Sequence, residues 1–133
     1  MIKANIEHIA IWVRDLEKMR AFYCKYFEGM TRDKYVSKNN VGFESYFVHF
    51  GMGCRLELMY KADIPESHHE ILKEYIGLTH FALKVGSREN VENLILRLES
   101  DGYEILGRPR LTGDGFYEAI ILDPEGNRVE IMS

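Results

Sequence analysis

The chain contains one pattern twice. At an offset of 73 positions, segments 42–57 and 115–130 share two glycines, a phenylalanine, an arginine and a glutamate without a gap. At an offset of 72 positions, segments 7–13 and 79–85 share a histidine, an alanine and a valine. A chain built from two such copies is expected to fold into two similar modules.

Each copy carries one histidine near its start and one glutamate near its end, His8 with Glu57 and His80 with Glu130. Imidazole and carboxylate groups are common protein ligands of divalent metals. A single histidine beside an apolar strand is ordinarily a structural residue. Because four ligand-type residues stand at equivalent points of two copies, we predict that all four belong to one metal site.

The length of the chain indicates one domain. Its 133 residues can bury a core, whereas half of it, about 60 residues, would be only marginally stable alone. We therefore expect a single domain over 1–133, with module one at about 4–60, a linker at 61–77 and module two at 78–133.

Charge and hydropathy exclude several classes of partner. The net charge is -4 and no basic stripe is present, which argues against nucleic-acid and anionic-membrane partners. A small molecule is the expected ligand. The N-terminus has no signal-peptide pattern and no apolar run approaches about 18 residues, so we expect a cytosolic protein that does not enter a membrane.

Hydrophobic periodicity predicts the order β-α-β-β-β in each copy. In the first copy the expected elements are strands at 6–13, 31–36, 45–50 and 55–60 and a helix capped by Asp15 and stopped by Gly29. In the second they are strands at 78–85, 103–108, 117–122 and 128–132, a helix at 87–100 and a turn at 123–127. One or two helical turns are expected in the linker, at 68–75.

Strand parity places the four candidate ligands. Side chains alternate across a strand, and His8, Glu57, His80 and Glu130 all fall on the face turned away from the predicted helix of their copy. If the two modules turn these faces toward each other, a cation between them would offset the carboxylate charge. The expected fold class is α+β, with two βαβββ modules whose mixed sheets form a curved cleft.

The same parity suggests residues that contact a substrate. Trp12, Met59 and Lys84 share the ligand face, together with Phe47. Lys84 is either a cation that meets a substrate carboxylate or phosphonate, or a solvent-exposed lysine.

Five other residues receive a structural interpretation. His49, His68 and His69 lack a counterpart in the other copy, and we expect them at the surface. Arg55 and Arg128 each stand two residues before a candidate glutamate. They could steer an anionic ligand, but we expect them instead to form an ion pair that orients that glutamate, or to be charges at the rim of the site.

The chain resembles the vicinal oxygen chelate superfamily, which includes glyoxalase I, fosfomycin-resistance enzymes, bleomycin-binding proteins and extradiol dioxygenases. The segments that carry the resemblance are 7–10, 22–29, 56–58, 78–82 and 122–131, the last with its Asp-Pro-Glu-Gly-Asn turn. The resemblance implies a divalent metal, Ni, Co or Zn, held by His8, Glu57, His80 and Glu130.

Within that superfamily the ligand pattern is most similar to bacterial glyoxalase I. This resemblance implies a lyase or isomerase that acts on an α-oxo or hemithioacetal substrate, with Glu130 as the catalytic acid/base and Glu57 fixing the metal. It also implies a homodimer and a thiol such as glutathione. Trp12 and Met59 depart from that family, because they replace polar residues expected to contact glutathione.

Two other functions stay open at this stage. A fosfomycin-type thiol transferase would use the same fold, but such sites usually have three protein ligands, so Glu57 counts against it. A metal-free antibiotic-binding protein of the bleomycin-resistance kind generally lacks the four ligands.

Overall fold

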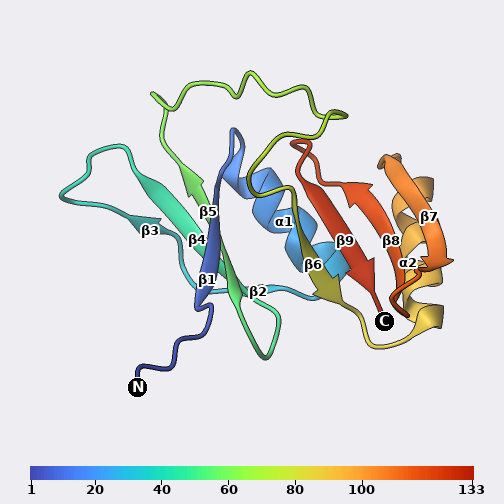
Figure 1. The fold of residues 1–133 in the computed structure, drawn as a ribbon. Coiled ribbons are helices and arrows are strands. Elements are labelled where there is room, and N and C mark those ends of the chain that lie inside the picture. The colour runs from blue at the N-terminus through green and yellow to red at the C-terminus, as the bar shows by residue number, and fades with distance from the viewer. The chain divides into compact units, whose positions relative to one another are not determined.

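The computed structural model describes residues 1–133 and divides into two compact units, Met1–Glu66 and Ser67–Ser133. The first unit contains β1 (His8–Trp12), α1 (Leu16–Phe27), β2 (Met30–Thr31), β3 (Tyr35–Val36), β4 (Glu44–His49) and β5 (Arg55–Tyr60) (Figure 1). The second contains β6 (His80–Lys84), α2 (Arg88–Ser100), β7 (Ile105–Leu111), β8 (Tyr117–Leu122) and β9 (Arg128–Met132). Neither helix has the length and apolar character needed to span a membrane. The α+β class and the two-module plan are confirmed.

The sheet of the first unit has the order β1-β5-β4-β2, and β3 pairs with β4. Strands β1 and β5 are parallel and the other pairs are antiparallel, so the sheet is mixed. Helix α1 packs against β4 and β5 (Figure 1). Met19 and Tyr23 of the helix and Val48 and Leu58 of the sheet are fully buried there. Each such side chain contributes about 1.5–3 kcal/mol.

The second unit repeats this plan with the order β6-β9-β8-β7. Strands β6 and β9 are parallel, and β7 and β8 extend the sheet in antiparallel pairs. Helix α2 contacts β7, β8 and β9. Ile95 and Leu98 of α2 and Ile121 and Ile131 of the sheet form its buried core. In both units the opposite face of the sheet carries no helix, which leaves it open to hold ligand-type residues.

The end of α1 differs from the prediction. The residue in the left-handed conformation is Glu28, with φ 53°, and not Gly29. Gly29 is needed instead for its lack of a side chain: a Cβ there would lie 2.5 Å from Val48 Cγ1 and 3.0 Å from the carbonyl oxygen of Tyr23. The glycine therefore permits the close approach of the helix end to β4.

Replacing Gly29 with alanine is expected to lower the free energy of unfolding by about 1–3 kcal/mol, the usual cost of overpacking a core. Urea denaturation measures this change. Gly113→Ala is the matched control, because no atom lies within 4 Å of a Cβ at that position. Equal stability of the two variants would contradict the close approach described above.

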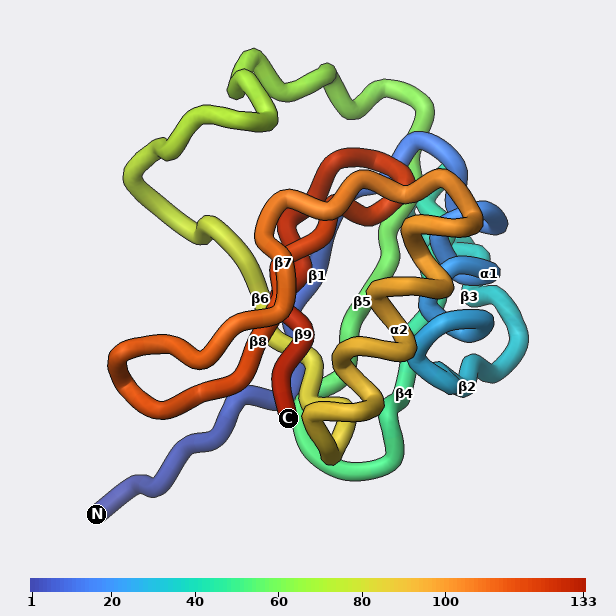
Figure 2. Tube along the Cα trace, turned by 90° about the vertical axis from the view of Figure 1, so that its right-hand side faces the viewer, coloured from blue at the N-terminus to red at the C-terminus, as the bar shows by residue number.

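Three other predicted elements also differ from the structure. The single strand expected at 31–36 is two short strands, β2 and β3, separated by a charged run at 32–34. The helical turns expected at 68–75 do not form, and the segment from β5 to β6 follows a path of turns and bends (Figure 2). The strand expected at 103–108 begins and ends later, at Ile105–Leu111.

Candidate functional site

The first candidate pair lies on the helix-free face of the first unit. In the parallel pairing of β1 with β5, His8 stands opposite Arg55 and Ala10 opposite Glu57. This register brings His8 Nε2 to 3.5 Å from Glu57 Oε2. The side chain of Glu57 is only 13% exposed, whereas that of His8 is 39% exposed. Parity therefore predicted the face on which these two residues lie, and their role as metal ligands stays a prediction.

Glu7 fixes the orientation of the His8 ring. Its carboxylate accepts a hydrogen bond from His8 Nδ1 and forms an ion pair with Arg55. The hydrogen bond from His8 is the main reason that the pKa of Glu7 lies below its ordinary value, and Arg55 adds to it. With Nδ1 engaged by Glu7, Nε2 is the ring nitrogen that lies toward Glu57 and is placed to bind a metal.

The second unit repeats the pair. His80 stands opposite Arg128 and Ala82 opposite Glu130, and His80 Nε2 lies 3.3 Å from Glu130 Oε2. The side chain of Glu130 is 14% exposed. The two copies of the repeat thus present the same two functional groups in the same geometry.

The two repeated arginines do not pair with the candidate glutamates as expected. Arg55 forms its ion pair with Glu7, and Arg128 forms one with Glu74. The physical reason is the register, which places each arginine opposite a histidine and toward the start of the neighbouring strand. Hydrogen bonds from Thr79 and then Arg128 lower the pKa of Glu74.

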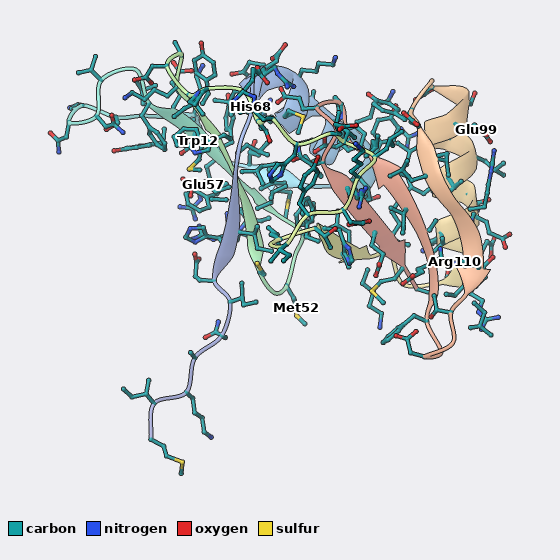
Figure 3. All side chains as sticks on the ribbon, turned by 45° about the horizontal axis from the view of Figure 1, so that its top comes forward. Trp12, Met52, Glu57, His68, Glu99 and Arg110 are labelled. Carbon is teal, nitrogen blue, oxygen red and sulfur yellow. The ribbon has the colours of Figure 1, made fainter.

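Glu118 is a neighbour of Glu130 that sequence reasoning missed. It lies on β8 with only 9% of its surface exposed, and Arg110 Nη2 is 3.4 Å from its carboxylate (Figure 3 labels Arg110). Burial raises the pKa of Glu118, and a hydrogen bond with Glu130 raises it further. A protonated Glu118 can therefore donate a hydrogen bond to Glu130. An acidic residue inside the apolar strand 117–122 was the available signal.

The three predicted substrate contacts lie on the expected face. Trp12 is 44% exposed and packs edge-on against Phe43, with ring centroids 5.9 Å apart. Met59 stands opposite Trp12, and Trp12 and Glu57 extend from the same side of their strands (Figure 3). Lys84 ends β6 opposite Met132 and is exposed. Their contact with a substrate stays a prediction.

A pocket of about 300 Å³ opens in the first unit, on the same face as the His8–Glu57 pair. Its lining residues come from β4, β5 and the segment around β2 and β3: Arg32, Asp33, Tyr35, Ser45, Phe47, His49 and Arg55. We refer to it as the module-one pocket. His49 was expected at the surface, but it is half-buried in this lining. Its parity with Phe47 was the signal, since both point to one face of β4.

The pairs fit a divalent metal in donor type and orientation. No group of three or more His, Cys, Asp or Glu side chains is gathered for a metal anywhere in residues 1–133. Each unit instead supplies one imidazole nitrogen and one carboxylate oxygen, and in the first unit Glu7 contacts the other nitrogen of the histidine ring. The four-ligand set predicted from the repeat is the sum of these two pairs, and it stays a prediction.

Comparisons with known proteins agree with this architecture. The family model of the Glyoxalase/Bleomycin resistance protein/Dioxygenase superfamily matches residues 5–131. Similar solved structures include the trypanothione-dependent glyoxalase I of Leishmania major, with TM-score 0.76, 21% identity and coverage of 98% of this chain and 87% of that one. Another is lactoylglutathione lyase from Agrobacterium tumefaciens, with TM-score 0.68, 22% identity and coverage of 98% and 93%. An uncharacterized Bacillus subtilis protein, YqjT, is 24% identical over 96% of this chain and 98% of its own length.

Proposed function

Because this chain belongs to the Glyoxalase/Bleomycin resistance protein/Dioxygenase superfamily, we propose that it is a metal-dependent lyase or isomerase of the glyoxalase I type. Its substrate would be a small α-oxo compound or a hemithioacetal. The observation that carries the proposal is the duplicated pair, His8 with Glu57 and His80 with Glu130, at 3.5 and 3.3 Å. Structural likeness to proteins described as glyoxalase I and lactoylglutathione lyase supports it.

The residues that would hold the metal are His8, Glu57, His80 and Glu130. Two imidazoles and two carboxylates suit Ni, Co or Zn and leave coordination positions for substrate oxygens. A metal bound there supplies Lewis acidity, which stabilises negative charge on two neighbouring oxygens of the substrate. The Glu7 carboxylate would keep the His8 ring in place.

Glu130 is the proposed acid/base. Its carboxylate takes the proton from one substrate carbon and returns it to the adjacent carbon, so the reaction is an isomerisation with no net gain or loss of atoms. Glu118 is the proposed positioning residue for Glu130, because burial raises its pKa and a protonated Glu118 could donate a hydrogen bond to the Glu130 carboxylate. In the β8–β9 register, Ile120 stands opposite Glu130 and Met132 stands opposite Glu118. Such proton transfer contributes about 10²- to 10⁴-fold to a rate.

The thiol and the assembly are part of the same proposal. The Leishmania major relative is described as trypanothione-dependent, so thiols other than glutathione belong in any assay of this protein. Trp12 and Met59 present apolar surface where a glutathione-specific site would need polar groups. We further propose a homodimer, the assembly that the family resemblance implies.

Two measurements test the proposal. Protein purified without a metal-binding tag is expected to bind Ni²⁺, Co²⁺ or Zn²⁺ at one site per chain, as measured by elemental analysis and calorimetry. The loaded protein is then expected to isomerise methylglyoxal hemithioacetals of glutathione or another thiol. Absence of metal binding would refute the enzyme proposal and favour a metal-free binding protein.

A further inference from the structure

The module-one pocket has the hydrogen-bond donors of an anion site. Its lining contains two guanidinium groups, from Arg32 and Arg55, against one carboxylate, from Asp33. Tyr35 and His49 add further groups that can donate hydrogen bonds. Because Arg55 is also paired with Glu7, the pocket offers a concentration of guanidinium donors and not a net positive charge. Guanidinium groups are the side chains best suited to carboxylates and phosphates.

Arg55 carries a donor with no partner. Its Nη2 forms an ion pair with Glu7 and its guanidinium lies 4.1 Å above the ring of Phe47. Its Nε is buried and makes no hydrogen bond. A buried donor without an acceptor is unfavourable, and an anionic oxygen that enters the pocket can supply the missing acceptor.

The pocket shares a wall with the candidate metal ligands. Phe47 lines the pocket, stands opposite Glu57 in the β4–β5 register, and packs edge-on against His8 with ring centroids 5.3 Å apart. Arg55 also lines the pocket and stands opposite His8. A small molecule with two functional groups can therefore reach the pocket and the His8–Glu57 pair together.

The residues that line the pocket differ from their equivalents in the second copy of the repeat. The register makes β4 and β8 equivalent, because Ser45 faces Met59 and Glu118 faces Met132. At the three positions where β4 contributes to the pocket, β8 has a carboxylate and two aliphatic side chains: Ser45, Phe47 and His49 correspond to Glu118, Ile120 and Leu122. The fold does not require a polar pocket at this place, which favours a role in ligand recognition.

We propose that the module-one pocket binds the anionic end of the substrate, a carboxylate or a phosphate-type group, while the reacting oxygens lie at the His–Glu pairs. The inference rests on the proposed function, since it names the substrate class of that same site. It assigns Arg32 and Arg55 as the residues that select for a negatively charged substrate.

The test uses metal-free, full-length protein, so that its outcome is independent of metal binding and of activity. Inorganic phosphate and acetate are titrated separately at constant ionic strength, and the NMR signals of Arg55 Nε–H and of the His49 ring are followed. We expect saturable shifts in the millimolar range for at least one anion. The anion that binds more tightly identifies the class as phosphate-type or carboxylate.

Arg32→Gln is expected to weaken this binding by about 10-fold, because one charge-assisted contact is lost. Arg32 is exposed, so the variant should keep its fold. Arg97→Gln is the matched control, since it removes the same charge from the exposed surface of α2 and should bind like the wild type. The proposal is overturned if neither anion saturates by about 50 mM, or if Arg32→Gln binds as tightly as the wild type.

Discussion

Replacing His80 with alanine is expected to lower the affinity for Zn²⁺ or Ni²⁺ by more than about 100-fold. Loss of a residue that only hydrogen-bonds to a metal-binding histidine and orients it already lowers metal affinity by about 10- to 100-fold. Loss of the histidine ligand itself must lower the affinity further. The remaining Glu130 would also lose the imidazole that lies 3.3 Å from its carboxylate. Competition with a chromogenic chelator measures the change in affinity.

His68→Ala is the matched control for this prediction. His68 belongs to the exposed segment between β5 and β6, outside the strands that carry the candidate pairs (Figure 3). Its loss is expected to leave metal affinity within a factor of about two, the scatter of a surface substitution. If His80→Ala and His68→Ala bind metal equally well, the repeated His–Glu pairs are not a metal site.

Local pattern predicted the elements that have clear boundaries. Strands β5, β8 and β9 were predicted at the residues where they occur. The apolar strand β8 and the alternating strand β9 flank a well-defined turn, in which Asp123 accepts hydrogen bonds from the backbone of Glu125 and Asn127. Such signals are contained in a few consecutive residues, and the sequence alone displays them.

Errors arose where distant residues decide the structure. Gly29 looked like a helix stop, but its small size serves the contact with Val48, which only the folded sheet brings near. The segment 31–36 has the composition of one strand, and it pairs with β4 as two short pieces. The local sequence pattern of 31–36 does not show with which strand each of its residues pairs.

The candidate site was also predicted only where spacing along the chain decides it. The repeat and strand parity predicted that all four residues lie on the helix-free face of their sheet, because both arguments depend only on spacing. The parallel pairings that bring each histidine beside its glutamate were not predicted. The module-one pocket was missed. It brings His49 together with Arg32, which lies in an edge segment whose path depends on tertiary pairing. Interpreting His49 as an isolated histidine ignored the parity that it shares with the ligand face.

Glu130 and Glu57 are expected to differ in their effect on turnover, although both would bind the metal. At saturating metal, Glu130→Gln should lower kcat for a hemithioacetal substrate by about 10²- to 10⁴-fold, because an amide cannot accept and return the proton. Glu57→Gln should retain a larger share of kcat at the same metal content, since the position equivalent to Glu118 in the first unit is Ser45, which carries no carboxyl group.

Steady-state kinetics with parallel elemental analysis separates proton transfer from metal loss in these variants. Glu104→Gln, a change at an exposed position on the approach to β7, is the matched control and should keep kcat within a factor of about two. A fall in kcat that follows metal content alone would assign both glutamates to metal binding and remove Glu130 as the acid/base. A larger fall of kcat in Glu57→Gln than in Glu130→Gln, at equal metal content, would instead assign the acid/base role to Glu57 of the first module. Because the two modules present the same His–Glu geometry, the asymmetry must come from what surrounds each glutamate, and the buried Glu118 beside Glu130 is the difference that the structure provides.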